Sequence, residues 1–346
     1  MTAPAAPIES APAAPTRAER SVPRAGWMVI SRKEFADHIL SSRFFVLLLL
    51  LSVVAAVPLY LTADVIRSAA SDASGGQAIF IALFWYTPPV PLLAGDTTLP
   101  SVAGFFGLVA PLLGLAFGFD AVNGERAQGT LPRLLSQPIH RDDVINGKFA
   151  AGLSVIGLVI VSIVGLIAAL GILRLGVVPT AAELLRIIVW VGITIVYVAL
   201  WLAFGMVLSV VVRRAATSAL IGFGIWFAVT FFGGLITGLI GGFFAPLTGS
   251  AEEVLRNNSV QETLSRLRPD ILYAEASRAL LSPQVTDVST PATIGAYEQA
   301  AQRIPSLLSL DQSFILVWPQ VVVLVALTVA CFAIAYVQFM RQEVRA

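Results

Sequence analysis

The sequence predicts an all-α, polytopic membrane protein, and three observations carry this prediction. Of its 346 residues, 57% are hydrophobic and only 12% are charged, and the mean hydropathy is +0.84. A soluble domain has roughly 45–50% apolar and about 25% charged residues, so the chain is too apolar for that class. The apolar residues also gather into runs of about 20, the length that a helix needs to cross a bilayer. The basic residues concentrate in alternate connections between these runs.

Six apolar runs are long enough to form membrane-spanning helices. They cover residues 44–62, 101–119, 149–173, 184–212, 217–244 and 314–339. A seventh stretch, 78–95, is also apolar, but Pro88, Pro89 and Pro91 would break a helix in its middle. We expect this stretch to be an external loop or a re-entrant segment, in preference to a seventh span.

The distribution of Lys and Arg predicts the orientation of the spans. The segments 1–43, 120–148, 213–216 and 340–346 hold 6, 4, 2 and 2 basic residues, whereas the short connections on the other side hold very few. Basic residues favour the cytoplasmic side, so we expect both termini to be cytoplasmic in a multi-pass protein of the plasma membrane. Residues 1–26 are rich in Ala and Pro and are predicted to be a disordered cytoplasmic tail, followed by a membrane domain over 27–346.

Residues 27–45 precede the first span and mix apolar and charged residues at near-helical spacing. The apolar positions are Trp27, Ile30, Phe35, Ile39 and Leu40. The pattern predicts an amphipathic helix on the inner membrane face, with a plain extension of the first span as the alternative.

The outer connection between the fifth and sixth spans, residues 245–313, is too long for a simple turn. We expect it to hold one or two helices broken near Pro269, packed on the membrane domain or on an extracytoplasmic partner; the alternative is a mere spacer. The apolar positions that favour packing are Leu264, Leu267, Ile271, Leu272, Leu280 and Leu281.

Several functional classes lose support from the sequence. The net charge of +1 argues against a nucleic-acid-binding protein, and the single cysteine, Cys331, cannot form an intrachain disulfide. His38 and His140 lie in separate polar segments, where surface histidines are the default, and no catalytic cluster is evident. The spans are nearly free of charged residues, which counts against an ion channel or a secondary transporter. We therefore expect a non-enzymatic chain without a bound cofactor or metal.

The segment 120–148 concentrates charge between the second and third apolar runs. Gly124 and Gly129 allow tight turns, and residues 130–138 are predicted to form a short helix, capped by Thr130 and ended by Pro138. Asp142 is well placed to begin the next helix. The sequence therefore predicts a short, rigid helical segment that is fixed at both ends by the spans. Such a segment can transmit force, whereas a flexible loop cannot.

This segment resembles the hallmark loop of permease subunits in the type-2 branch of ABC transporters, and most closely the multi-span permeases of the nitrous-oxide-reductase maturation system. The resemblance extends over roughly residues 27–340. The matching positions are Asp120, Glu125, Arg126, Gly129, Thr130, Leu131, Leu134, Leu135, Ser136, Pro138, Ile139, Arg141, Gly147 and Lys148.

The resemblance implies that the loop 120–148 contacts a separate ATPase subunit, present in two copies, which binds ATP and Mg. The chain would then act as a homodimer, or with a related permease subunit, in an ATP-driven transporter that we expect to be an exporter. The rival expectation is a mechanotransmission subunit, which passes motion to an extracytoplasmic partner at 245–313 without moving a substrate. This chain has no phosphate-binding loop of its own.

Two ridges of small residues are predicted to allow close helix packing within the subunit. We expect the other faces of the spans to contact membrane lipid. A dimer seam or a sliding gate is the alternative. The ridges consist of Gly114 and Gly118 in the second span and of Gly234, Gly238 and Gly242 in the fifth.

Overall fold

The computed structural model describes residues 26–72, 79–87, 100–130, 140–176, 178–282 and 308–342. Within these ranges every regular element is helical, which confirms the predicted fold class. The predicted tail, 1–26, lies outside the described residues apart from Gly26, as does the stretch 283–307.

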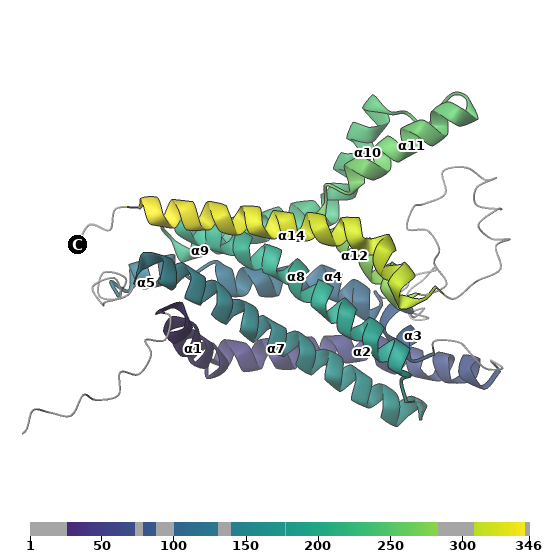
Figure 1. The fold of residues 1–346 in the computed structure, drawn as a ribbon, viewed down its shortest axis with the longest axis horizontal. Coiled ribbons are helices and arrows are strands. Elements are labelled where there is room, and N and C mark those ends of the chain that lie inside the picture. The colour runs from purple at the N-terminus through teal and green to yellow at the C-terminus, as the bar shows by residue number, and fades with distance from the viewer. Residues whose placement is uncertain are drawn as a thin grey trace, which may run out of the picture.

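Long helices run side by side and form the body of the molecule (Figure 1). Their bounds are α2 (Ser42–Asp72), α4 (Val102–Gly118), α7 (Arg141–Leu175), α8 (Ala181–Val211) and α14 (Leu310–Arg341). In the described residues five helices are long and apolar enough to cross a membrane, or six if a bent pair that includes α2 counts as one span. The prediction of six spans agrees with the larger number. Several helices are longer than their apolar runs, because helix-forming residues continue them beyond the apolar part.

The helix α1 (Gly26–Ile39) precedes α2 and is bent from its Phe44–Tyr60 part by 61°. Because of this bend α1 is not a straight extension of the first span, and it lies against α7 instead. Gly147 permits this contact, since a Cβ atom there would be 2.8 Å from Ile30. A separate helix before the first span was predicted; its position on a membrane surface stays a prediction.

The closest helix contact joins α4 and α8. A Cβ atom on Gly114 would lie 2.7 Å from the backbone nitrogen of Leu202, and one on Gly118 would lie 2.6 Å from the Leu202 carbonyl oxygen. Gly205 on α8 meets Gly118 in turn. Bare backbones at these positions let the two helices approach closely, which is how helices associate where lipid removes the hydrophobic drive.

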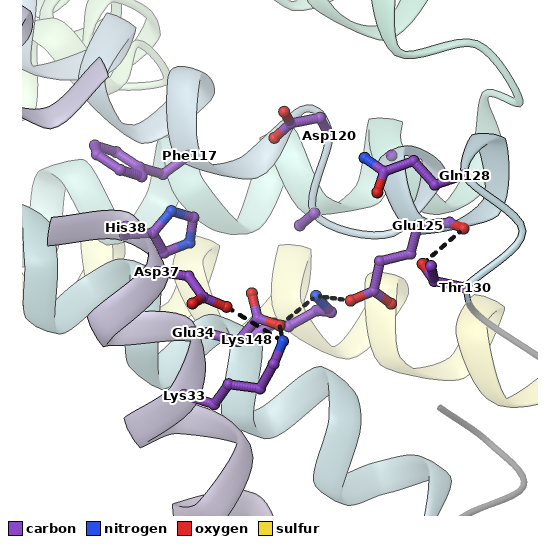
Figure 2. Close-up of a pocket in the computed structure, with 12 residues that line it drawn as sticks. Lys33, Glu34, Asp37, His38, Phe117, Asp120, Glu125, Gln128, Thr130 and Lys148 are labelled. Atoms are coloured by element: carbon purple, nitrogen blue, oxygen red, sulfur yellow. Dashed lines mark hydrogen bonds and ion pairs between the residues drawn. The ribbon is translucent and has the colours of Figure 1, made fainter. Parts of the chain in front are cut away.

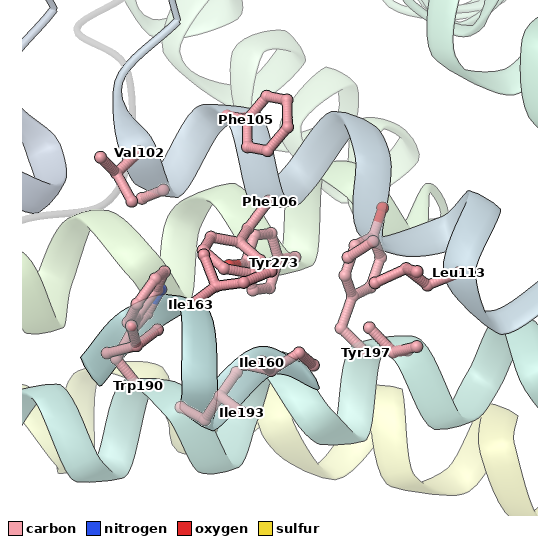
Figure 3. Packing of buried hydrophobic residues seen from close by; sticks show 14 of the residues in the cluster. Val102, Phe105, Phe106, Leu113, Ile160, Ile163, Trp190, Ile193, Tyr197 and Tyr273 are labelled. Atoms are coloured by element: carbon pink, nitrogen blue, oxygen red, sulfur yellow. The ribbon is translucent and has the colours of Figure 1, made fainter. Parts of the chain in front are cut away.

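Aromatic side chains fill the centre of the bundle near one end of this helix pair (Figure 3). The ring of Trp190 lies 5.6 Å from Phe84 and 5.5 Å from Phe106, between centroids. Tyr197 stacks on Tyr273 with their centroids 4.5 Å apart. These contacts bring α8 together with α3, α4 and α12, so one core holds the spans and the helices between them.

Two further helices follow the fifth span. That span consists of α9 (Ala215–Phe227), the π-helix η1 (Ala228–Phe232) and α10 (Gly233–Phe244). The helix α11 (Ala251–Ser265) packs on α10, and together they project from the body as a hairpin (Figure 1). The helix α12 (Pro269–Leu281) returns to the body and packs against α8 and α14.

The connection between the fifth and sixth spans was predicted to hold helices broken near Pro269, and Pro269 is the first residue of α12. Leu272, Leu280 and Leu281 are buried as expected. Leu267 was also expected to pack, but its side chain is 73% exposed, because it lies in the turn between α11 and α12.

In the part of the chain that the structure describes, the glycine ridge of the fifth span does not pack as predicted. A Cβ atom on Gly238 or Gly242 would meet nothing within 4 Å, and one on Gly234 would approach only Arg268, at 3.2 Å. The packed face of α10 contains Gly233 and Gly241 instead. The spacing identified a row of glycines, but it did not indicate which side of the helix faces a neighbour.

The short helix α3 (Ile79–Trp85) accounts for the described part of the proline-rich stretch 78–95. Seven residues are too few to cross a membrane, and the helix is buried among the long ones, which favours a re-entrant segment. Glu183 Oε1 accepts hydrogen bonds from the backbone N–H groups of Phe80, at 2.9 Å, and Ile81, at 3.4 Å. The three prolines lie outside the described residues.

A charged side chain lies buried inside the bundle. Arg186 lies in the second turn of α8 and is buried. Its guanidinium donates to the carbonyl oxygens of Leu280 and Leu308 and to Ser313 Oγ. A buried cation is stable only with such partners, and here it joins α8 to the end of α12 and the beginning of α14.

The α4–α8 contact predicts a sharp difference between two glycine substitutions. Gly118→Ala should destabilise the protein by about 1–3 kcal/mol, because the new methyl group meets rigid backbone on α8. Gly192→Ala on α8 meets nothing within 4 Å and should leave stability unchanged or raise it slightly. Thermal unfolding in detergent compares the two. Equal midpoints for both variants would show that the close approach is absent.

Candidate functional site

The charged segment 120–148 leaves α4 at one end of the body and returns through α7. Its described parts are 120–130, which contains the short helix α5 (Asn123–Ala127), and 140–148. Gly129 has a φ of +67° and makes the predicted turn, whereas Gly124 is helical. Part of the segment lies outside the described residues, and with it the helix predicted over 130–138. The site residues concerned are Leu131, Leu134, Leu135, Ser136 and Pro138.

The end of α8 anchors the beginning of α5. Ser209 Oγ accepts hydrogen bonds from the backbone N–H groups of Val122, at 2.9 Å, and Asn123, at 3.1 Å. The Asn123 amide donates to the carbonyl oxygen of Val212, at 3.3 Å. The first N–H groups of a helix have no partner within it, so these bonds supply what α5 lacks and fix it to α8.

Lys148 joins three elements near the centre of the site (Figure 2). Its Nζ lies 2.6 Å from Glu125 Oε1 on α5 and 3.1 Å from Glu34 Oε1 on α1, while Lys148 itself belongs to α7. The Lys148 side chain is only 5% exposed. Because a buried cation is costly without a carboxylate beside it, this arrangement fixes the positions of α1, α5 and α7 relative to one another.

Two arginines of the segment, Arg126 and Arg141, reach the end of α14. Arg126 donates to the side-chain oxygen of Gln342, and Arg141 Nη1 donates to the Gln342 carbonyl oxygen at 3.0 Å. The Gln342 amide in turn donates to the carbonyl oxygen of Val210 at 2.7 Å. The last spanning helix is therefore tied to both sides of the charged segment and to α8.

The beginning of α7 is fixed to the beginning of α1. Asp142 and Asp143 lie in the first turn of α7, as expected for acidic residues near the positive end of a helix. Asp143 makes the contacts: it accepts from the backbone N–H of His140 at 3.3 Å and from that of Trp27 at 2.9 Å. The sequence correctly predicted a helix start here but favoured the neighbouring Asp142.

A cavity of about 450 Å³ opens between α1, the end of α4 and α5 (Figure 2). Carboxylates outnumber lysines in its lining, so the cavity is acidic. The carboxylates are Glu34, Asp37, Asp120 and Glu125, and the lysines are Lys33 and Lys148. Within the part of the chain that the structure describes, Glu125 Oε2 is buried without a hydrogen-bond partner.

His38 lines the same cavity and is partly buried, although the sequence suggested a surface histidine. Its ring meets Phe117 edge to face, with the centroids 5.2 Å apart. Burial lowers the pKa of the imidazole below its ordinary value, while the nearby carboxylate of Glu34 acts in the opposite direction. This favours the neutral form of His38, which suits a contact between two rings.

The structure thus brings Asp120, Glu125, Arg126, Gly129, Thr130, Arg141 and Lys148 to one end of the body. Sequence reasoning missed four residues that hold the segment in place: Glu34, Asp143, Ser209 and Gln342. Ser209 offered a weak signal, as a polar residue in an apolar run. Glu34 and Gln342 offered none, because nothing in a single sequence shows which distant segment a side chain will reach.

A comparison with family models matches residues 28–344 to the ABC-2 family transporter protein model. The chain belongs to the ABC-2 transporter family. It is also 28% identical over 202 residues to the probable ABC transporter permease protein NosY of Stutzerimonas stutzeri. That match covers 57% of this chain and 64% of the relative, so it spans somewhat less than two thirds of the relative's length. Both findings agree with the family that the motif in 120–148 indicated.

Membership of this family and the apolar helices together identify a multi-pass membrane protein of the permease type. The matched range includes the whole segment 120–148 and both ends of the described bundle. The site described above is therefore part of the family's domain and not an appendage to it.

Two lysines of the cavity form a matched pair for a stability test. Lys148→Met should destabilise the protein by about 2–4 kcal/mol, because Glu34 and Glu125 would lose their common cation in a mostly buried site. Lys33→Met should change stability by less than about 1 kcal/mol, since the Lys33 side chain is 66% exposed. Thermal unfolding in detergent measures both.

A double substitution distinguishes the ion pair from simple packing. Glu125→Gln should lower the free energy of unfolding less in the Lys148→Met background than in the unmodified protein, because in that background the carboxylate has already lost its partner. Strictly additive effects would mean that Glu125 and Lys148 do not interact.

Proposed function

We propose that this chain is the membrane-spanning permease subunit of an ATP-driven ABC transporter, acting as an exporter. A separate ATPase subunit, present in two copies with ATP and Mg, supplies the energy. The observation that carries the proposal is the set of polar contacts that ties the charged segment to α1, α7, α8 and α14. Family membership and the similarity to a probable ABC transporter permease support it.

The proposed coupling surface is the segment 120–148. An ATPase that moves this segment would displace α5, and Ser209 would carry that displacement to α8. Lys148 would carry it to α1 and α7, and Gln342 would carry it to α14. Because packed helices and charge-assisted hydrogen bonds deform little, the bundle would respond as a connected body. In this mechanism the residues of the segment transmit motion and take no part in the chemistry of ATP hydrolysis.

The assembly we propose contains two permease chains, either identical or related. Large apolar side chains on α9 and α10 are exposed, and Gly238 and Gly242 face open space beside them. A spanning helix of this kind faces either lipid or the second permease chain, and glycines allow a close approach in the second case.

A mechanotransmission subunit is the second candidate function, and the projecting hairpin of α10 and α11 favours it. Leu255, Val260 and Leu267 are exposed on or beside α11. A lever that extends from the body could pass motion to an extracytoplasmic partner at 245–313 without a path for substrate.

We propose that the end of the body that carries α5 is cytoplasmic, with both termini on that side. In a Cys331→Ala background, a cysteine in place of Gln128 beside α5 should be protected from an impermeant thiol reagent added to intact cells. A cysteine in place of Ser259 on α11 should react, since both positions are exposed and only the membrane separates them. The opposite labelling pattern would reverse the orientation and contradict the proposed ATPase contact.

Two kinds of substitution test the coupling role. The double change Leu134→Ala/Leu135→Ala should lower affinity for the ATPase about tenfold or more, as expected when apolar residues at the centre of an interface are truncated. Glu125→Gln and Arg126→Gln should leave the ATPase bound but separate its turnover from transport, because they loosen the segment from the spans.

Co-purification and ATP turnover in reconstituted membranes measure these effects, with Arg256→Gln on the distant α11 as the control. If all the variants bind the ATPase and turn over ATP like the unmodified complex, the segment 120–148 is not the coupling element.

A further inference from the structure

A second cavity, of about 530 Å³, lies at the opposite end of the body from α5. The end of α3, the first two turns of α4, the π-helix η1 and α12 surround it. Its volume is within the range of pockets that bind small molecules. None of the residues that line it belongs to the coupling site.

The walls of the cavity are mainly apolar and are held rigidly. Gly107 forms part of one wall, and its carbonyl oxygen accepts a hydrogen bond from Tyr197 Oη at 3.1 Å. This carbonyl is available because Pro111, four residues later in α4, has no N–H to donate to it. Tyr273 forms another wall and stacks on Tyr197. A preformed apolar wall suits the body of an apolar molecule.

Most polar groups of the cavity already have partners in the protein. Ser277 Oγ accepts a hydrogen bond from Trp190 Nε1, and Ser101 Oγ accepts one from the backbone of Gly104. The single carboxylate of the lining, Asp270, is paired with Arg268. These groups therefore add little net charge to the site.

Arg278 is the exception. It is exposed on the lining, and the described residues contain no ion pair to its guanidinium. The first turn of α4 lines the same cavity, and the beginning of a helix adds partial positive charge. The cavity thus combines an apolar body with an excess of positive charge.

The π-helix η1 contributes Thr230 to the lining. π-Helical turns inside α-helices are frequently found at functional sites. Here the turn separates α9, which packs on α4 through Trp226, from the projecting α10.

We propose that this cavity binds an anionic amphiphile, a molecule with a carboxylate or phosphate head and an apolar body. The head pairs with Arg278 near the first turn of α4, and the body lies against Gly107, Leu108 and Tyr273. Two sources have this chemistry: a molecule moved by the transporter, or a resident anionic lipid. The first source rests on the proposed function, whereas binding to the cavity does not.

The test measures binding of radiolabelled dodecyl phosphate to the chain in nanodiscs of zwitterionic lipid, with empty discs subtracted. Arg278→Gln should weaken binding about fivefold, as expected for one exposed charge partner. Ala274→Trp should abolish it by filling the cavity; Ala274 is exposed on the lining, so the fold should tolerate the change. Arg256→Gln, outside the cavity, should bind like the unmodified chain, and dodecyltrimethylammonium should bind to none of them at the site.

Unchanged binding in both Arg278→Gln and Ala274→Trp would overturn the proposal, as would equal binding of the cationic probe. The source is then decided on the complex with its ATPase. Dodecyl phosphate that stimulates ATP turnover only when the cavity is intact identifies a transported molecule. An anionic lipid that co-purifies with the unmodified chain, but not with Ala274→Trp, identifies a resident lipid. If the chain forms no complex with an ATPase, the proposed function is contradicted, but the binding of dodecyl phosphate to the cavity is not.

Discussion

The bundle depends on the direct approach of two backbones, those of α4 and α8, at Gly114, Gly118 and Gly205. Among lipid chains, apolar side chains gain little by meeting each other, so helices associate through close packing and hydrogen bonds. Side chains at these positions would keep the two helices apart. Their contact fixes the relative height and rotation of both helices, and α8 then supplies the surface on which α12 and α14 pack.

The same helix pair determines the geometry at both ends of the body. At one end, Ser209 of α8 accepts hydrogen bonds from the backbone N–H groups of Val122 and Asn123, and these bonds fix the position of α5. At the other end, Tyr197 of α8 donates a hydrogen bond to the carbonyl oxygen of Gly107 in α4, which Pro111 cannot bond because it has no N–H. This contact holds one wall of the second cavity. A shift of α4 along α8 would therefore alter both sites together. This gives a physical route by which movement of the charged segment could reach a molecule bound at the far end.

Three polar side chains connect elements that lie far apart in the sequence. Lys148 and Arg186 each join three elements, and Gln342 joins the end of α14 to α5, α7 and α8. A buried charge is costly, so Lys148 and Arg186 are stable only when their partners are in place. These groups therefore specify one arrangement of helices that the apolar surfaces alone would leave undetermined.

The sequence by itself determined the fold class, the apolar runs and the segment 120–148, because long apolar runs and closely spaced motif residues are local features. It also predicted the break at Pro269 and the turn at Gly129, since proline and glycine restrict or widen the backbone at their own positions. Only the tertiary structure decided that Lys148 meets both Glu125 and Glu34, and that Arg126 and Arg141 meet Gln342. The same holds for Gly238 and Gly242, which meet no neighbour among the described residues. Helical spacing shows which residues share a face, but which helix lies opposite that face depends on the packing of the whole bundle.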